Sequence, residues 1–162
     1  MLVLTTLTKE ALPVVRYWTG DITSLSSGPC VCGRTLVRMA RIKGRADDML
    51  IIRGVNVYPT QVEAALLQLG ELTPNYRILV SRAGTLDEAE VEIEVSEAFL
   101  LGAGTDSLAD DLQHVRELRE RAERRLKETI GCSLPVALRA PGAVPRSDGG
   151  KLQRVVDQRS LA

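Results

Sequence analysis

Apolar residues recur every three or four positions over a long stretch in the second half of the chain. They are Leu108, Leu112, Val115, Leu118, Ala122, Leu126 and Ile130. This spacing places them on one face of an α-helix, and Gly131, which follows them, is the residue type that commonly ends a helix. The chain must therefore contain a layer of structure against which a long amphipathic helix buries one side.

Shorter patterns on both sides of this helix indicate the rest of that layer. In chain order they predict a strand at 49–52, a helix from Pro59 to Gly70, strands at 77–81 and 91–95, the long helix, a strand at 135–138 and a closing segment at 152–159. The strand at 91–95 alternates with glutamates, which predicts a half-buried strand with one acidic face. The order strand, helix, strand, strand, helix, strand is typical of the ferredoxin-like split β-α-β arrangement, so we expect an α+β sandwich.

The beginning of the chain has a different character from the rest. Turn signals lie at Thr19–Asp21 and Ser26–Pro29, and the regular periodicity begins only near Gly44. We therefore expect residues 1–40 to form a short hairpin-and-loop segment without a closed core, and residues 41–162 to form the α+β domain.

Composition argues against several classes of function. The 21 basic and 21 acidic residues cancel, and aromatic residues make up only 3% of the chain, so neither a basic patch nor a stacking platform for nucleic acid is expected. No apolar run reaches the ~18 residues that a membrane helix needs, and the N-terminal stretch lacks the basic start of a signal peptide. Three cysteines do not make a disulfide framework, which favours the reducing cytoplasm.

Sequence motifs for the commonest nucleotide and hydrolase sites are absent. There is no P-loop and no dinucleotide-binding glycine motif, and the single histidine, His114, falls in the middle of the long helix. Asp21 follows a turn glycine, where its carboxylate could accept two hydrogen bonds from a vicinal diol such as a ribose. The alternative interpretation is an ordinary turn aspartate.

Two further clusters combine glycine with a cationic side chain. The first runs from Gly44 to Pro59, where Arg45 could hold a phosphate with two donors and Gly54 would allow a ligand close to the backbone. The second surrounds Lys151, which follows two glycines and could be delivered into a neighbouring site to stabilise developing negative charge. A loop, strand and helix cap in the first case, and a surface loop in the second, are the alternatives.

A pair of thiols forms the last cluster. Cys30 and Cys32 are separated by one residue, which suggests half of a structural zinc site. Only Cys132 and His114 remain as further soft ligands, so a complete zinc site within this chain is not expected. Simple buried or surface thiols are the alternative.

Taken together and in this order, the clusters resemble the adenylate-forming acyl-CoA synthetases, and most closely the phenylacetate–CoA ligase family. The string from Gly44 to Pro59 carries this resemblance most specifically. The run from Pro145 to Lys151, with the following 154–157, resembles the family's C-terminal lysine loop, and the stretch Cys30–Thr35 also occurs in many members. The resemblance covers essentially the whole chain but only the last third or so of a family enzyme.

The resemblance implies an activity in two steps. Such ligases activate a carboxylate with ATP to an acyl-adenylate, release pyrophosphate, and transfer the acyl group to coenzyme A. A small C-terminal domain rotates between the two steps. By resemblance, Asp21 would hold the ribose, Arg45 would lie near the nucleotide, Asp47 would be the hinge, Lys151 would reach the carboxylate and α-phosphate, and Gly54, Val55 and Asn56 would face the site during thioester formation.

The sequence departs from the family pattern in three respects. Trp18 stands where the family usually has arginine, Gly149–Gly150 precedes Lys151 where many members have one glycine after an acidic residue, and the large N-terminal domain is absent. We therefore expect residues 1–40 to be the end of that large domain and the chain alone to be inactive as a ligase.

The resemblance also implies ligands and partners. These are ATP/AMP, CoA and Mg²⁺, a small, typically aryl, carboxylic acid as in phenylacetate catabolism, and the missing large domain. Zinc and a homodimer are left open. The rival hypothesis is a non-catalytic ferredoxin-like module with a regulatory or assembly role.

Overall fold

The chain divides into two compact units, Met1–Met49 and Leu50–Ala162. The computed structural model describes residues 1–104, 108–109, 112–146 and 154–159. The two units differ in how much of their apolar surface is buried.

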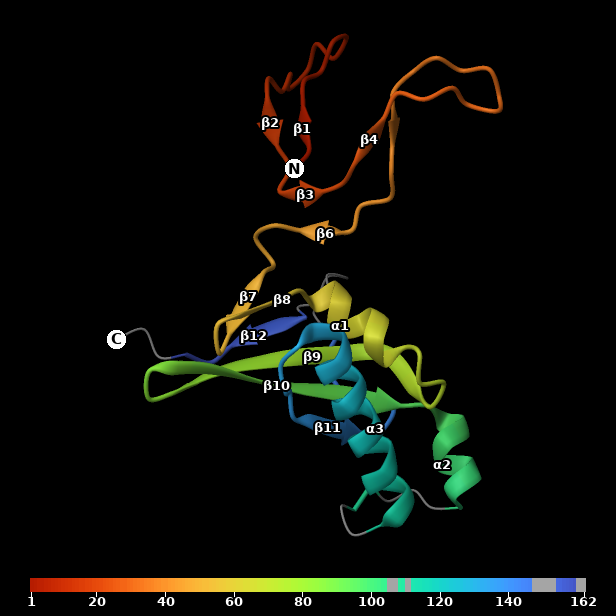
Figure 1. Cartoon of the computed structure of the whole chain (residues 1–162), viewed down its shortest axis with the longest axis vertical. Coiled ribbons are helices and arrows are strands. Elements are labelled where there is room, and N and C mark those ends of the chain that lie inside the picture. The colour runs from red at the N-terminus through yellow and green to blue at the C-terminus, as the bar shows by residue number, and fades with distance from the viewer. Residues whose placement is uncertain (105–107, 110–111, 147–153, 160–162) are drawn as a thin grey trace. The chain divides into compact units, whose positions relative to one another are not determined.

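Three pairs of very short antiparallel strands make up the first unit (Figure 1). They are β1 (Val3–Leu4) with β2 (Tyr17–Trp18), β3 (Asp21–Ile22) with β6 (Gly44–Arg45), and β4 (Leu25–Ser26) with β5 (Arg38–Met39). All of the buried apolar residues described belong to the second unit, and large apolar side chains of the first unit, such as Leu7 and Val31, are exposed. The first unit therefore has no hydrophobic core of its own among these residues.

The second unit is built on a four-stranded mixed sheet in the order β11-β10-β9-β12. Its centre is the antiparallel hairpin of β9 (Leu72–Ala83) and β10 (Leu86–Val95). β11 (Val136–Arg139) runs parallel to β10, and β12 (Val155–Asp157) runs parallel to β9. A separate hairpin of β7 (Leu50–Ile52) and β8 (Val55–Val57) precedes the sheet in the chain.

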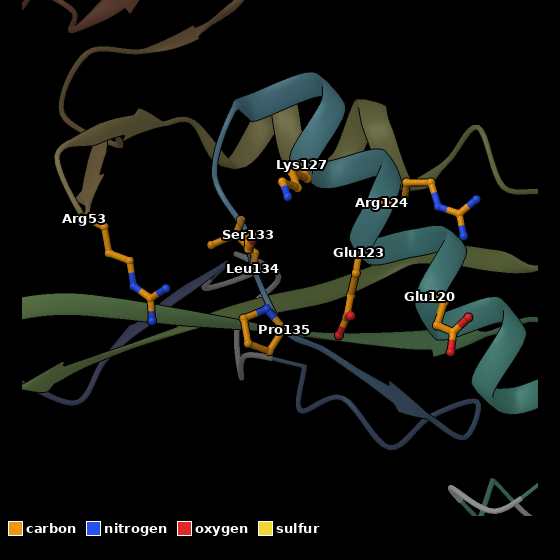
Figure 2. Close-up of a pocket in the computed structure, with 8 residues that line it drawn as sticks. All are labelled: Arg53, Glu120, Glu123, Arg124, Lys127, Ser133, Leu134 and Pro135. Carbon is orange, nitrogen blue, oxygen red and sulfur yellow. The ribbon is translucent and has the colours of Figure 1, made fainter.

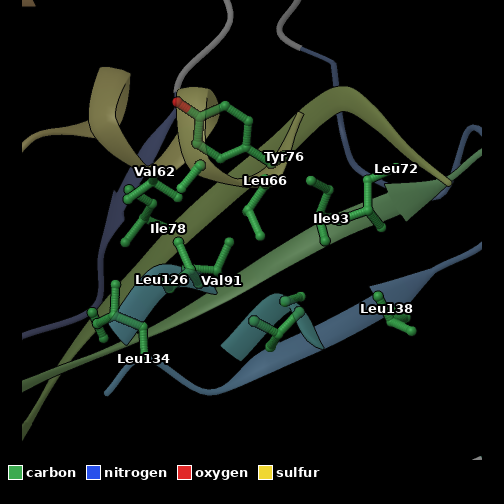
Figure 3. Packing of buried hydrophobic residues seen from close by; sticks show 14 of the residues in the cluster. Val62, Leu66, Leu72, Tyr76, Ile78, Val91, Ile93, Leu126, Leu134 and Leu138 are labelled. Atoms are coloured by element: carbon green, nitrogen blue, oxygen red, sulfur yellow. The ribbon is translucent and has the colours of Figure 1, made fainter. Parts of the chain in front are cut away.

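Helices α1 (Pro59–Leu66) and α3 (Gln113–Ile130) pack against each other and against this sheet, while α2 (Glu97–Ala103) follows β10 (Figure 1). Figure 3 shows the core between them, where Leu66 of α1 and Leu126 of α3 meet Ile78 and Ile93 of the central hairpin. Leu66, Leu126 and Ile78 are fully buried, which makes this cluster the main apolar contribution to the stability of the unit.

The α+β class predicted from the sequence is confirmed by this arrangement. The ferredoxin-like arrangement is not confirmed, because β7 pairs with β8 instead of entering the four-stranded sheet, and β12 occupies the position beside β9. The long helix ends at Gly131 as expected, with a φ of +88° that suits glycine. It begins at Gln113, later than the apolar spacing indicated. Among the described helices, none combines the length and apolar character that crossing a bilayer requires.

Candidate functional site

Antiparallel pairing of β3 with β6 brings two of the predicted site residues together in the first unit. Asp21 lies opposite Arg45 in this pairing, and the Ala46 amide donates a hydrogen bond to the Gly20 carbonyl oxygen at 2.7 Å. Gly20 is buried and has a φ of +79°, and a Cβ atom there would lie 3.0 Å from Asp47 Oδ1. The φ value favours glycine at this position, because other residues rarely adopt it, whereas the Asp47 side chain could move away from a Cβ atom.

Arg45 donates two hydrogen bonds to the Asp47 carboxylate. Arg45 Nε lies 3.0 Å from Asp47 Oδ1, and Arg45 Nη2 lies 2.6 Å from Asp47 Oδ2. These hydrogen bonds hold the pKa of the Asp47 carboxyl below its usual value and raise the pKa of Arg45. About half of each side chain remains exposed, so this charged pair faces solvent within its own unit.

The β7–β8 turn carries three other predicted residues, Gly54, Val55 and Asn56, in the second unit. Arg53 and Gly54 have φ values of +50° and +81°, which close a tight turn. A Cβ atom on Gly54 would meet nothing within 4 Å, and Asn56 is exposed while Val55 is half-buried. The turn therefore presents an open stretch of backbone, as an approaching ligand would need.

Lys151 lies outside the described residues. The chain on its downstream side is fixed by Arg154, whose guanidinium carbon lies 4.4 Å from the centre of the Tyr76 ring. Arg154 Nη2 also lies 3.2 Å from Glu63 Oε1. Sequence reasoning placed Arg154 in the lysine loop but did not anticipate these contacts, because Glu63 and Tyr76 belong to distant segments.

The two thiols of the Cys-x-Cys segment lie beside each other. Cys32 Sγ is 3.0 Å from Cys30 Sγ, and hydrogen bonding from Cys32 lowers the pKa of Cys30. Cys132 is buried in the second unit, and burial raises the pKa of its thiol. In the described part of the chain, no group of three or more His, Cys, Asp or Glu side chains could hold a metal ion. Cys30 and Cys32 thus offer two of the four ligands of a tetrahedral site.

An open hollow of about 410 Å³ lies beside α3, and sequence reasoning did not identify it (Figure 2). Its lining residues are Arg53, Glu120, Glu123, Arg124, Lys127, Ser133, Leu134 and Pro135. Glu123 already accepts a hydrogen bond from the Val136 amide at 3.1 Å, and Arg53 is paired with Glu88 at 2.5 Å. In the sequence, the only indication of this hollow is that four of its charged residues, at positions 120, 123, 124 and 127, fall on one face of a helix. That spacing is equally typical of a helix face that is exposed to solvent.

Comparisons with known proteins agree on one family. Residues 54–159 match the family described as the AMP-binding enzyme C-terminal domain. The chain is 57% identical to phenylacetate-coenzyme A ligase of Thermus thermophilus over 98% of the chain and 37% of that protein. It is 44% identical to the phenylacetate-coenzyme A ligase of Escherichia coli, over 99% of the chain and 34% of that protein. The chain thus spans about a third of the length of these curated relatives.

Solved structures give the same result. A 2-hydroxyisobutyryl-CoA ligase in the postadenylation state, in complex with R3-HIB-AMP, has a TM-score of 0.79 and 33% identity, and it covers 96% of this chain and 31% of its own. A domain of phenylacetate-coenzyme A ligase from Bacteroides vulgatus has a TM-score of 0.58 and 36% identity, and it covers 72% of this chain and 97% of its own. Both are similar to this chain in fold and in sequence.

Proposed function

Because the chain belongs to the family of AMP-binding enzyme C-terminal domains, we propose that it serves as the mobile C-terminal part of an AMP-forming phenylacetate-type CoA ligase. The complete enzyme would activate an aryl or other small carboxylic acid with ATP and transfer the acyl group to CoA. The observation that carries this proposal is the position of Asp21 opposite Arg45, which also binds Asp47. A carboxylate that can accept hydrogen bonds from a diol is thereby paired with a cation that can bind phosphate.

The three predicted site residues of the first unit then have roles in nucleotide binding or domain movement. Asp21 holds the ribose hydroxyls, and Arg45 lies near the nucleotide phosphates. Asp47 is the hinge, and its position directly before the division between the units at Met49 and Leu50 supports this role. Because Asp47 is exposed, its backbone can change conformation without disturbing a core.

The residues of the second unit act in different half-reactions. Lys151 stabilises the charge that develops on the carboxylate and α-phosphate during adenylation. Gly54, Val55 and Asn56 line the path of the CoA thiol during transfer, and the open side of Gly54 supports this role. The same chain can serve both steps only if the second unit changes its orientation between them.

The first unit packs against the rest of the large N-terminal domain, which carries the acyl pocket and the phosphate loop. The exposed apolar side chains of residues 1–49 support this assignment, because such side chains usually cover a neighbouring surface. Residues 1–40 are then the end of that large domain. ATP, CoA and Mg²⁺ act in the complete enzyme, and zinc requires further ligands from outside this chain. The free thiols favour a cytoplasmic location.

The proposal is tested by expressing the chain together with a cognate large domain and assaying CoA-thioester formation with aryl acids. We expect pyrophosphate release and thioester formation from the combination and neither from the chain alone. A stable complex that forms no thioester with any aryl acid would favour a regulatory or assembly module instead.

A further inference from the structure

Glu94 is a carboxylate buried at the end of β10. Glu94 is only 1% exposed. Asn75 Nδ2 donates to Glu94 Oε2 at 2.9 Å, and the Val144 amide donates to Glu94 Oε1 at 2.9 Å. A buried carboxylate is costly unless such donors satisfy it, so the position of Val144 is set by this side chain.

Glu92 provides a direct contrast on the same strand. It lies two positions earlier, on the same face of β10, and is 4% exposed. Its partners are the guanidinium groups of Arg77 and Arg139, which belong to the neighbouring strands. Glu92 therefore joins only strands of the sheet, whereas Glu94 joins strand β9, through Asn75, to a connecting segment outside the sheet at Val144.

The segment that Glu94 holds leads towards Lys151 in the sequence. Val144 is 2% exposed, and Arg146 Nη2 lies 4.0 Å from Glu94 Oε2. Beyond the lysine, Arg154 Nη1 donates to the Pro74 carbonyl oxygen at 3.2 Å. Pro74 precedes Asn75, which is the β9 partner of Glu94. The chain before 147–153 is therefore attached to β10 through Glu94, and the chain after it is attached to the adjoining part of β9 through Pro74.

We infer that Glu94 is a positioning residue for the adenylation step. By holding the backbone at Val144, together with the attraction for Arg146, it fixes the point from which the chain continues to Lys151. This inference rests on the proposed function, because Lys151 is the group that would use the fixed position. A small misplacement of a catalytic group can cost on the order of 10²-fold in rate, so the hold on Val144 matters for chemistry as well as for stability.

The attachment of Val144 is measured first, by amide hydrogen exchange in the 162-residue chain. Glu94→Met removes both acceptor oxygens, and we expect exchange at Val144 to become about tenfold faster. Glu94→Gln keeps one acceptor, and the Asn75 amide can turn to complement it, so exchange should stay near the original rate. Glu92→Met is the matched control on the same strand and should leave Val144 protected. Unchanged exchange in Glu94→Met would overturn the inference.

The positioning role is measured next, in the chain combined with its large domain. Glu94→Met should slow pyrophosphate release about 10- to 100-fold, while thioester formation from preformed acyl-adenylate changes less than about twofold. Glu94→Gln should restore adenylation. If Glu94→Met does not fold, Asn75→Leu removes one of the donors that orient Glu94 and should give a smaller loss of the same kind.

The outcomes separate this inference from the proposed function. Equal losses in both half-reactions, or no loss in either, would overturn the role of Glu94 and leave the ligase activity standing. An original enzyme that makes no acyl-adenylate would overturn the proposed function and the positioning role with it, whatever the exchange at Val144.

Discussion

Arg45 and Asp47 form a two-point ion pair across a single intervening residue, with donor–acceptor distances of 3.0 and 2.6 Å. The pair constrains the backbone directly before the division between the two units. If Asp47 is the hinge, rotation of the second unit changes the backbone within this short span. The ion pair then favours one hinge conformation over others.

Asp47→Pro tests the hinge. The fixed φ of proline should lock the backbone, so an enzyme locked in its first pose should still release pyrophosphate but fail to form thioester. Asp47→Asn is the matched control, because it weakens the pair with Arg45 and leaves φ free. We expect Asp47→Asn to carry out both half-reactions. Normal thioester formation by Asp47→Pro would exclude a hinge at this position.

Acid should weaken the contact of β12 with the central hairpin. Arg159 binds both Asp157 and Asp87, and its hydrogen bonds lower the pKa of Asp157 from 3.8 to about 2. A lowered folded-state pKa means that this stabilisation is complete above 3.8 and is lost as the pH falls towards 2. Asp157→Asn should therefore lower the free energy of unfolding at neutral pH but not near pH 2.

Urea unfolding across this pH range measures the effect. Arg159→Gln should flatten the same part of the pH profile, because it removes the cation that shifts the carboxyl groups. The effect should be small, since Asp157 is an exposed side chain in water. A difference between Asp157→Asn and the original chain that persists unchanged near pH 2 would contradict this assignment.

Leu126→Ala tests the core of the second unit. Leu126 is fully buried where α3 meets the sheet, so the cavity should lower the free energy of unfolding by about 2–5 kcal/mol. Thr129→Ala, on an exposed position of the same helix, should change it by less than about 0.5 kcal/mol. All described helices lie in the second unit, so far-ultraviolet circular dichroism reports this unit. The fluorescence of the single tryptophan, Trp18, reports on the first unit. At the same denaturant concentration, this fluorescence should be the same in Leu126→Ala as in the original chain.

Local chemistry accounts for the parts of the fold that the sequence predicted well. Gly131 ends α3 because its φ of +88° is strained for other residues, and Pro59 begins α1 because its missing amide hydrogen is not needed there. Helix α2 was not predicted, although its signals are local too. Ser96 accepts a hydrogen bond from the Phe99 amide at its start, and Gly104 adopts a left-handed conformation at its end.

Long-range pairing accounts for what the sequence left undetermined. The alternation in β10 predicted an acidic face, but the burial of Glu92 and Glu94 depends on partners from β9, β11 and the 140–146 segment. Strand β7 was expected as the first strand of the fold, yet its partner is β8. A short apolar run predicts a strand but does not select its neighbour.

In the candidate site, too, local sequence indicates single residues, whereas long-range pairing decides which of them come together. Nothing in the local sequence around Asp21 indicates that Arg45 lies opposite it, since the paired strands β4 and β5 and their connection separate the two in the chain. Only the resemblance to a family suggested that both act on one nucleotide. The roles of Asp21, Arg45, Asp47, Lys151 and the β7–β8 turn remain predictions.

Zinc binding should depend on ligands from outside this chain. Cys30 and Cys32 supply two ligands, which leaves a tetrahedral ion half coordinated. Metal analysis should find no stoichiometric zinc in the chain alone, and any zinc in the complete enzyme should be lost in Cys30→Ser. Cys132→Ser is the control, because that thiol is buried in the second unit. Zinc that the chain alone retains against a mild chelator would contradict this prediction.

Lys151→Ala tests the charge proposed for adenylation. Lys151 follows Gly149 and Gly150, and its compact ammonium group suits a residue that must arrive at a site and leave it again. In the complete enzyme, the substitution should slow pyrophosphate release by about 10²–10³-fold, which is typical for one electrostatic contact with a transition state. Thioester formation from preformed acyl-adenylate should change much less, because the proposed rotation of the second unit would by then have moved Lys151 out of the site. Lys127→Ala, the same change on α3, should affect neither step, and equal losses in both steps for Lys151→Ala would reject its role.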